Sequence, residues 1–142
     1  MAIKKRGNAH WEGTLKEGNG TVSTASGALE ANPYGFNTRF EGQPGTNPEE
    51  LIAAAHASCF SMAFSMVLGQ SDLTPSAIDT ECTVTLEEKD GGFAVTASHL
   101  TVSATVPGAS EDQVREAAEG AKANCPISKL LNAEITMDLT VS

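Results

Sequence analysis

The chain has 142 residues, 40% of them hydrophobic, and a formal net charge of −9 at pH 7. This length and apolar content suit one domain with its own core, so residues 1–142 are predicted to form a single domain. The acidic balance disfavours nucleic acid as a partner, because phosphate groups would be repelled. No apolar run follows the basic start of the chain, so no signal peptide is predicted and a cytoplasmic protein is expected.

The first third of the chain is predicted to form a hairpin followed by an irregular segment. Alternating residues predict a strand over 9–15, and turn residues after it predict a return strand over 21–24. Residues 26–48 are rich in Gly, Pro and Asn, and they carry aromatic residues around a single cation, Arg39. An irregular segment of this length is usually functional or disordered, and the aromatic residues favour order.

A long helix is predicted over residues 47–69. Asn47 suits the N-cap and Pro48 the first helical position, and Glu49 and Glu50 place negative charge at the positive end of the helix dipole. No Asp, Glu, Lys or Arg occurs over residues 51–68, so the helix is predicted to be buried nearly all round.

A membrane span is the first alternative for this helix, because 18 uncharged residues approach the length needed to cross a bilayer. The segment is rich in Ala and Ser and contains His56, and the rest of the chain alternates like soluble strands. A buried core helix is therefore predicted, with no membrane partner.

Two strands are predicted after the long helix. Residues 79–87 alternate between a polar face and an apolar face that includes Cys82. Two glycines then turn the chain into a strand over 93–106, whose change of phase predicts a bulge between Ala97 and Leu100.

The end of the chain is predicted to form two helices and a strand. Ser110 and Gln113 have the spacing of a capping box for a helix through Lys122. Pro126 suits the first position of a short helix, which places Cys125 at its N-cap. A last strand follows, with four apolar residues facing inward, Ile135, Met137, Leu139 and Val141. This order predicts an α+β fold with antiparallel sheets packed on helices.

The three cysteines lack the spacing of a CxxC motif, so each is either an apolar core residue or a chemical group. Cys82 lies on the inward face of a strand and is interpreted as core. Cys59 lies in the middle of the long helix, whereas Cys125 begins a helix, where backbone N–H groups favour a thiolate. The two could form a redox pair, although a lone cysteine in a buried helix is more often a small apolar residue.

A buried Cys59 needs a cation to become a thiolate. Arg39 is the candidate cation, with Glu49 to hold its guanidinium in place. Each of these residues also has a simpler role, since Glu49 could merely favour the helix dipole and Arg39 could pair with any acid. A zinc site of His56, Cys59 and Cys125 is a further alternative, but it lacks a fourth ligand with recognisable spacing, and no metal is predicted.

Four stretches of the chain resemble the OsmC family of the OsmC/Ohr superfamily of organic hydroperoxide reductases. They are WEG at 11–13, YGFNTRFEG at 34–42, GTNPEELIAAAHASCFSMA at 45–63 and AKANCPIS at 121–128. The resemblance implies a peroxidatic Cys59, a resolving Cys125 and an activating pair of Arg39 and Glu49, with Glu50 as the weaker candidate for the acid.

The resemblance also implies an intertwined homodimer built around a long buried central helix, with two active sites at the interface. The sequence gives its own reason for a partner, because Glu49 and Cys59 lie about 15 Å apart along one helix axis. The expected activity, in oxidative or osmotic stress defence, is reduction of organic hydroperoxides to alcohols through a Cys59 sulfenic acid and a Cys59–Cys125 disulfide.

No bound cofactor is expected for this activity, and the resemblance suggests dihydrolipoamide or a lipoylated protein as the external dithiol reductant. An apolar entrance for the peroxide is predicted from four residues, Tyr34, Phe36, Phe40 and Met62. The alternative function is a non-catalytic stress-response dimer that binds an apolar ligand.

Overall fold

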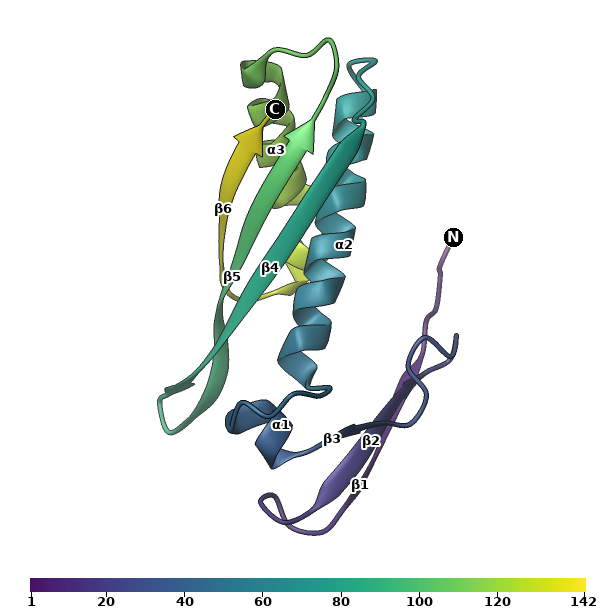
Figure 1. Cartoon of the computed structure of the whole chain (residues 1–142), viewed down its shortest axis with the longest axis vertical. Helices are drawn as coiled ribbons and strands as arrows, with labels where there is room; N and C mark the ends of the chain where they lie inside the picture. Colours follow the sequence, from purple (N-terminus) through teal and green to yellow (C-terminus); the bar gives the residue numbers. More distant parts are fainter. The chain divides into compact units, whose positions relative to one another are not determined.

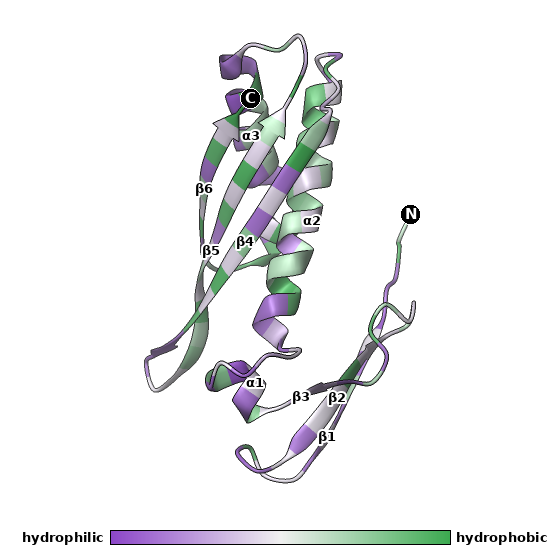
Figure 2. Ribbon diagram, viewed as in Figure 1, coloured by the Kyte–Doolittle hydropathy of each residue, from purple (hydrophilic) through white to green (hydrophobic).

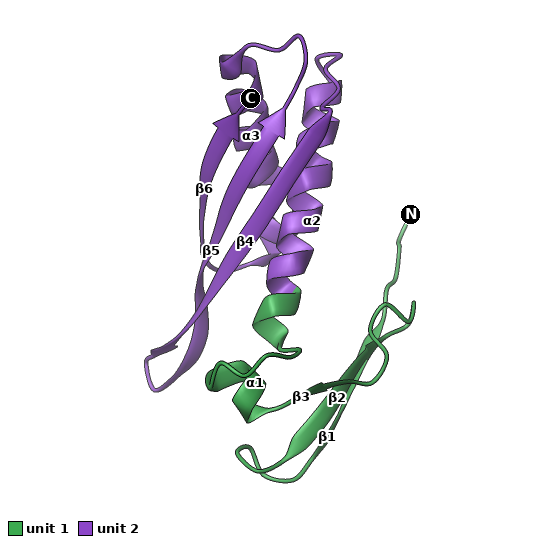
Figure 3. Cartoon of the chain, viewed as in Figure 1, with its two compact units in different colours: residues 1–51 green, residues 52–142 purple.

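A computed structural model describes all residues from 1 to 142. The chain divides into two compact units, residues 1–51 and 52–142 (Figure 3). Each unit has a three-stranded sheet of its own, β1-β2-β3 in the first and β4-β5-β6 in the second (Figure 1). The single domain over 1–142 therefore stays a prediction.

The first unit opens with the predicted hairpin. Strand β1 (Gly7–Glu12) pairs antiparallel with β2 (Asn19–Thr24), which also pairs with β3 (Asn32–Tyr34). The segment over 26–48 is ordered, as its aromatic residues favoured, but it is not wholly irregular, since it contains β3 and the one-turn helix α1 (Phe36–Phe40). The local cause is Thr38, whose hydroxyl accepts from the Gly35 N–H and donates to the Gly35 carbonyl, both at 3.0 Å.

The first unit contributes no hydrophobic side chain to the buried core, whose members all lie in the second unit. Its Ile3 and Leu15 are 72% and 64% exposed. A small sheet without a buried apolar face has little stability of its own. This unit therefore needs an apolar surface to pack against.

The second unit contains a correction to the predicted topology. Strand β4 (Ala77–Lys89) pairs antiparallel with β5 (Gly92–Thr105), as expected, but β6 (Glu134–Val141) pairs with β5 in parallel. The cause is the helical crossover between β5 and β6, which carries the chain back to the end of the sheet where β5 begins. This crossover consists of α3 (Glu111–Asn124) and α4 (Pro126–Leu130).

The predicted bulge in β5 exists but lies earlier than expected. Thr85 pairs with Ala97 and Leu86 pairs with Val95, which leaves Thr96 as the extra residue. After the bulge every second residue of β5 is buried, namely Ser98, Leu100, Val102 and Ala104.

The core of the second unit lies between one face of its sheet and the helices α2 (Pro48–Gly69) and α3. Figure 2 shows the matching alternation of hydrophobic and hydrophilic bands along β4 and β5. The predicted inward side chains of β6 pack against this core. Helix α3 begins with the predicted Ser110–Gln113 capping box, and its buried residues are Val114, Ala117, Ala118 and Ala121.

Helix α2 is less buried in one chain than its sequence predicts. Only one stripe is fully buried, at a spacing of four residues, because the sheet and α3 of one chain cover a single side. On the other side Met62 and Met66 are 77% and 63% exposed. By length and composition α2 could cross a membrane. However, its stripe of His56, Phe60, Phe64 and Leu68 is packed like that of a core helix.

Candidate active site

The structure brings Cys59 and Cys125 together. Cys59 is partly buried on α2, and Cys125 is fully buried at the N-cap of α4. Their side chains are in hydrogen-bonding contact, and Cys59 also has a hydrogen bond to the backbone of Ile127. Both cysteines are free thiols. A disulfide between two such thiols requires their Cα atoms to lie within about 7 Å of each other.

Cys125 is held in place because two helices meet at it. Its N–H donates to the Ala121 carbonyl at 2.9 Å and ends α3, and its carbonyl accepts from the Lys129 N–H at 3.1 Å and begins α4. Pro126 occupies the first position of α4, as predicted. The local sequence therefore fixes the backbone of Cys125 from both sides.

The surroundings of Cys59 within the second unit disfavour its thiolate. Burial raises the pKa of the Cys59 thiol and the neighbouring Cys125 raises it further, whereas the Ile127 backbone hydrogen bond lowers it. The net result is a raised pKa, which reduces the thiolate fraction at neutral pH. A reactive Cys59 thus requires a cation that the second unit does not supply.

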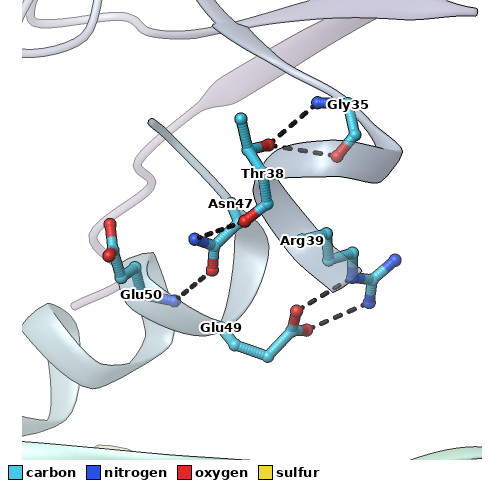
Figure 4. Close-up of polar contacts among 6 residues, drawn as sticks. All are labelled: Gly35, Thr38, Arg39, Asn47, Glu49 and Glu50. Carbon is cyan, nitrogen blue, oxygen red and sulfur yellow. Dashed lines mark hydrogen bonds and ion pairs between the residues drawn. The ribbon is translucent and has the colours of Figure 1, made fainter. Parts of the chain in front are cut away.

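The first unit contains the predicted cation and acid as a bidentate ion pair (Figure 4). Arg39 Nε and Nη2 donate to Glu49 Oε1 and Oε2 at 2.8 and 3.0 Å. The hydrogen bond that Arg39 donates to Glu49 is the main cause of the raised pKa of Arg39. Glu50 has a different place, since its backbone N–H donates to Asn47 Oδ1 at 2.9 Å in the helix cap. Glu49 is therefore the acid that pairs with Arg39.

The start of α2 is also tied to α1. Asn47 Nδ2 donates to the Thr38 carbonyl at 3.4 Å, one residue before Arg39 (Figure 4). The Arg39 guanidinium lies 5.2 Å from the centroid of the Phe40 ring, a distance at which a cation is attracted to an aromatic face. These contacts limit the positions that the guanidinium can take.

Three of the four residues predicted for the substrate entrance line one pocket with Arg39. Tyr34, Phe36 and Phe40 surround a volume of about 180 Å³ in the first unit. Met62 is not among the residues that line this pocket; it belongs to the second unit, where it is exposed on α2.

Trp11 also lines this pocket and was missed by the sequence analysis. Its ring lies 5.5 Å from that of Tyr34. The strand position Gly20 pairs with both residues, and a Cβ there would come within 2.8 Å of each ring. A glycine inside a strand is the signal that could have indicated this close approach.

His56 is fully buried, and both of its ring nitrogens are engaged by serines. Nδ1 lies 2.6 Å from Ser98 Oγ, and Nε2 lies 2.7 Å from Ser128 Oγ. Burial lowers the pKa of His56, so the ring is neutral at pH 7. The structure has no group of three His, Cys, Asp or Glu side chains that could hold a metal ion. The zinc site considered for His56 is therefore not formed.

Cys82 faces inward from β4, as predicted, and its Sγ lies 3.1 Å from Ser98 Oγ. Burial raises the pKa of this thiol, although the Ser98 hydrogen bond lowers it in part. Cys82 is partly buried, and a thiol with a raised pKa is a poor nucleophile at neutral pH. These features agree with the interpretation of Cys82 as a core residue.

The fold is α+β, and it holds a thiol on a long helix in contact with a second thiol at the start of a short helix. These features define a class of two-cysteine redox proteins. The family model described as OsmC-like protein matches residues 40–140. The chain belongs to this family, as its motifs predicted.

Curated relatives cover nearly the whole chain. It is 56% identical over 138 residues to Peroxiredoxin OsmC of Escherichia coli (strain K12). The aligned residues cover 97% of this chain and 96% of that protein. It is 29% identical over 121 residues to the organic hydroperoxide resistance protein OhrB of Bacillus subtilis (strain 168), which is 84% of this chain and 87% of that protein.

Solved structures confirm the predicted OsmC/Ohr-like fold. The crystal structure of OhrB of Bacillus subtilis matches with a TM-score of 0.70 at 24% identity, covering 95% of this chain and 98% of that chain. The crystal structure of an organic hydroperoxide resistance protein from Elizabethkingia anophelis matches with a TM-score of 0.69 at 26% identity. The match covers 100% of this chain and 99% of that chain.

Proposed function

We propose that this protein is a thiol-dependent peroxidase that reduces organic hydroperoxides to alcohols in stress defence. The observation that carries the proposal is the contact between the free thiols of Cys59 and Cys125. The names of the relatives, a peroxiredoxin and an organic hydroperoxide resistance protein, support the same chemistry. Nothing in the site favours the alternative of a non-catalytic ligand-binding dimer.

The reaction has two steps at the thiol pair. The Cys59 thiolate attacks the distal oxygen of the hydroperoxide, the alcohol leaves with a proton, and Cys59 becomes a sulfenic acid. The Cys125 thiol then condenses with this sulfenic acid, which forms a disulfide and releases water. An external dithiol, for which dihydrolipoamide or a lipoylated protein is the candidate, returns both cysteines to thiols. No bound cofactor is required.

Arg39 and Glu49 are proposed to activate Cys59 across a homodimer. Glu49 precedes Cys59 by ten residues on the same helix, about 15 Å along its axis, so the pair cannot reach the thiol of its own helix directly. Arg39 and Glu49 of the partner subunit would supply the cation that the second unit lacks. The Arg39 N–H donors would also stabilise the departing oxygen of the peroxide.

Two further features support a homodimer with active sites at its interface. The side of α2 opposite its buried stripe is apolar and exposed in one chain. The first unit has no buried apolar side chain. A second copy of the chain would cover both surfaces. Exposed apolar residues of this extent favour such an interaction site. We also propose that the dimer works in the cytoplasm.

The aromatic pocket beside Arg39 is the proposed peroxide entrance. Its walls of Tyr34, Phe36 and Phe40 favour a substrate with an apolar group over hydrogen peroxide, which has none. Trp11 lines the same pocket and is proposed as a further wall of this entrance.

The proposed activity is tested by product formation without any added reductant. Reduced protein mixed with excess cumene hydroperoxide is expected to release one equivalent of 2-phenyl-2-propanol per subunit in a rapid first phase, measured by liquid chromatography. The ligand-binding alternative predicts bound hydroperoxide and no alcohol. Addition of a dithiol should then convert the single burst into continuous turnover.

The homodimer is tested by a charge on the exposed side of α2. Met62→Glu should weaken the dimer at least about 100-fold, because a carboxylate would be buried there without a partner. Analytical ultracentrifugation measures the dissociation constant. Thr101→Glu, at an exposed position of β5, is the matched control and should leave it unchanged. A Met62→Glu protein that sediments as the wild type would contradict this interface.

A further inference from the structure

A buried row of polar side chains lies beside the thiol pair and takes no part in the proposed chemistry. Cys82 contacts Ser98, Ser98 contacts His56, and His56 contacts Ser128, at 3.1, 2.6 and 2.7 Å. His56 and Ser98 are completely inaccessible to solvent, and Ser128 is 8% exposed. Hydrogen bonds in such a site are costly to lose, because water cannot replace a missing partner.

This row connects the two helices that carry the thiols. His56 lies on α2 one turn before Cys59, and Ser128 lies on α4 three residues after Cys125. The His56–Ser128 bond therefore joins α2 to α4 close to both cysteines. At its other nitrogen His56 is fixed to β5 through Ser98, so the ring itself cannot turn freely.

Helix α4 needs such an attachment. It has only five residues, too few to be stable as an isolated helix. Leu130 at its end is 73% exposed and adds little packing. Among its side chains, Ile127 packs against the core and Ser128 is the buried polar one. The hydrogen bond of Ser128 is thus the polar contact that ties the interior of α4 to the rest of the unit.

We propose that His56 is a positioning residue for the second chemical step, acting through Ser128 to keep Cys125 within reach of oxidised Cys59. This inference rests on the proposed peroxidase function. In that step the Cys125 sulfur forms a bond to the Cys59 sulfur, the S–OH bond breaks, and the hydroxyl leaves as water with the Cys125 proton. The first step, attack of Cys59 on peroxide, forms no bond to Cys125, and the contacts of Cys59 with Cys125 and with the Ile127 backbone have opposite effects on its pKa.

The consequence is a competition between two fates of the sulfenic acid. Either Cys125 condenses with it, or a second peroxide oxidises it to the sulfinic acid, which is not returned by dithiols. A displacement of about 1 Å can slow a reaction between held groups about 100-fold. A loosened α4 should therefore shift Cys59 toward over-oxidation while leaving its first oxidation unchanged.

The test compares Ser128→Ala with Ser98→Ala, which each remove one hydrogen bond of the same histidine. Samples quenched with dimedone after cumene hydroperoxide addition are analysed by mass spectrometry for sulfenic acid, disulfide and sulfinic acid. In Ser128→Ala we expect sulfenic acid to form at the wild-type rate, disulfide to form at least about tenfold more slowly, and sulfinic Cys59 to accumulate. Ser98→Ala, which leaves α4 attached, should stay within about twofold of wild type in all three.

Equal rates of disulfide formation in Ser128→Ala and wild type would overturn the proposal. Equal slowing in Ser128→Ala and Ser98→Ala would also overturn it, because the row would then act only on general stability. A wild type that forms neither sulfenic acid nor disulfide would refute the peroxidase function instead, so the two failures are distinguishable.

A second pair of variants keeps the test valid should Ser128→Ala fail to fold. His56→Gln places an amide near the position of Nε2 and can keep the Ser128 bond, whereas His56→Asn places one near Nδ1 and can keep only the Ser98 bond. Slow disulfide formation is expected in His56→Asn and fast formation in His56→Gln. The reverse order would contradict the proposal.

Discussion

Cys59→Ser is expected to lower peroxide turnover at least about 1,000-fold, to the rate of the uncatalysed reaction, because the nucleophile is lost and a serine hydroxyl does not ionise at neutral pH. The variant should fold normally, since serine is close in size to cysteine and Cys59 is only partly buried. Consumption of cumene hydroperoxide with excess dithiol measures the effect.

Cys125→Ser is the matched control, because it removes the other thiol of the same contact. It should still reduce one equivalent of peroxide per subunit and then over-oxidise at Cys59, since no thiol is left to condense with the sulfenic acid. Full turnover by Cys59→Ser would remove Cys59 from the mechanism. A normal disulfide in Cys125→Ser, formed with Cys82, would reassign the resolving role.

Arg39→Ala is expected to lower turnover about 100-fold, the usual effect of losing one charged donor at a reacting oxygen. It should also raise the pH midpoint of Cys59 alkylation. The direction follows from charge, because a cation stabilises the thiolate and lowers the thiol pKa, so its removal lets the pKa rise. Iodoacetamide labelling across a pH series, read at Cys59 by peptide mass spectrometry, measures the shift.

Arg115→Ala is the control for this prediction. Arg115 also pairs with a glutamate, Glu111, at 2.8 Å, but on the exposed surface of α3. Its removal changes the net charge by the same amount and should leave the alkylation midpoint in place. Arg39→Lys should recover little of the activity, because a lysine cannot make the bidentate contact with Glu49. An unchanged midpoint in Arg39→Ala would exclude Arg39 from the site.

Local signals explain why much of the fold was predictable from the sequence. Asn47 caps α2 and Ser110 with Gln113 caps α3 through contacts within three residues, which the sequence displays directly. Burial along strand β4 alternates with a period of two, so the residues of its inward face can be predicted from the sequence. Pairings that depend on distant segments were less accessible, and the parallel placement of β6 beside β5 is the main example.

The candidate site was likewise predictable from the sequence only in part. The cysteines and the Arg39–Glu49 pair stand in motifs, and the bidentate geometry selects Glu49 over Glu50, which sequence position alone could not decide. The partners of His56 lie 42 and 72 residues away in the chain, and no local pattern connects them. The exposed side of α2 was predicted to be buried because it is apolar. One chain does not cover this side, so the prediction fails for a single chain.

The most direct test of the central claim is intact mass combined with a free-thiol count, before and after one equivalent of cumene hydroperoxide is added to the reduced protein. The proposed mechanism predicts a loss of about 2 Da and of two thiols per subunit, as two S–H hydrogens leave when a disulfide forms. Peptide mapping should place the new disulfide between Cys59 and Cys125. An unchanged mass with three free thiols would contradict the mechanism and leave the ligand-binding dimer as the better account.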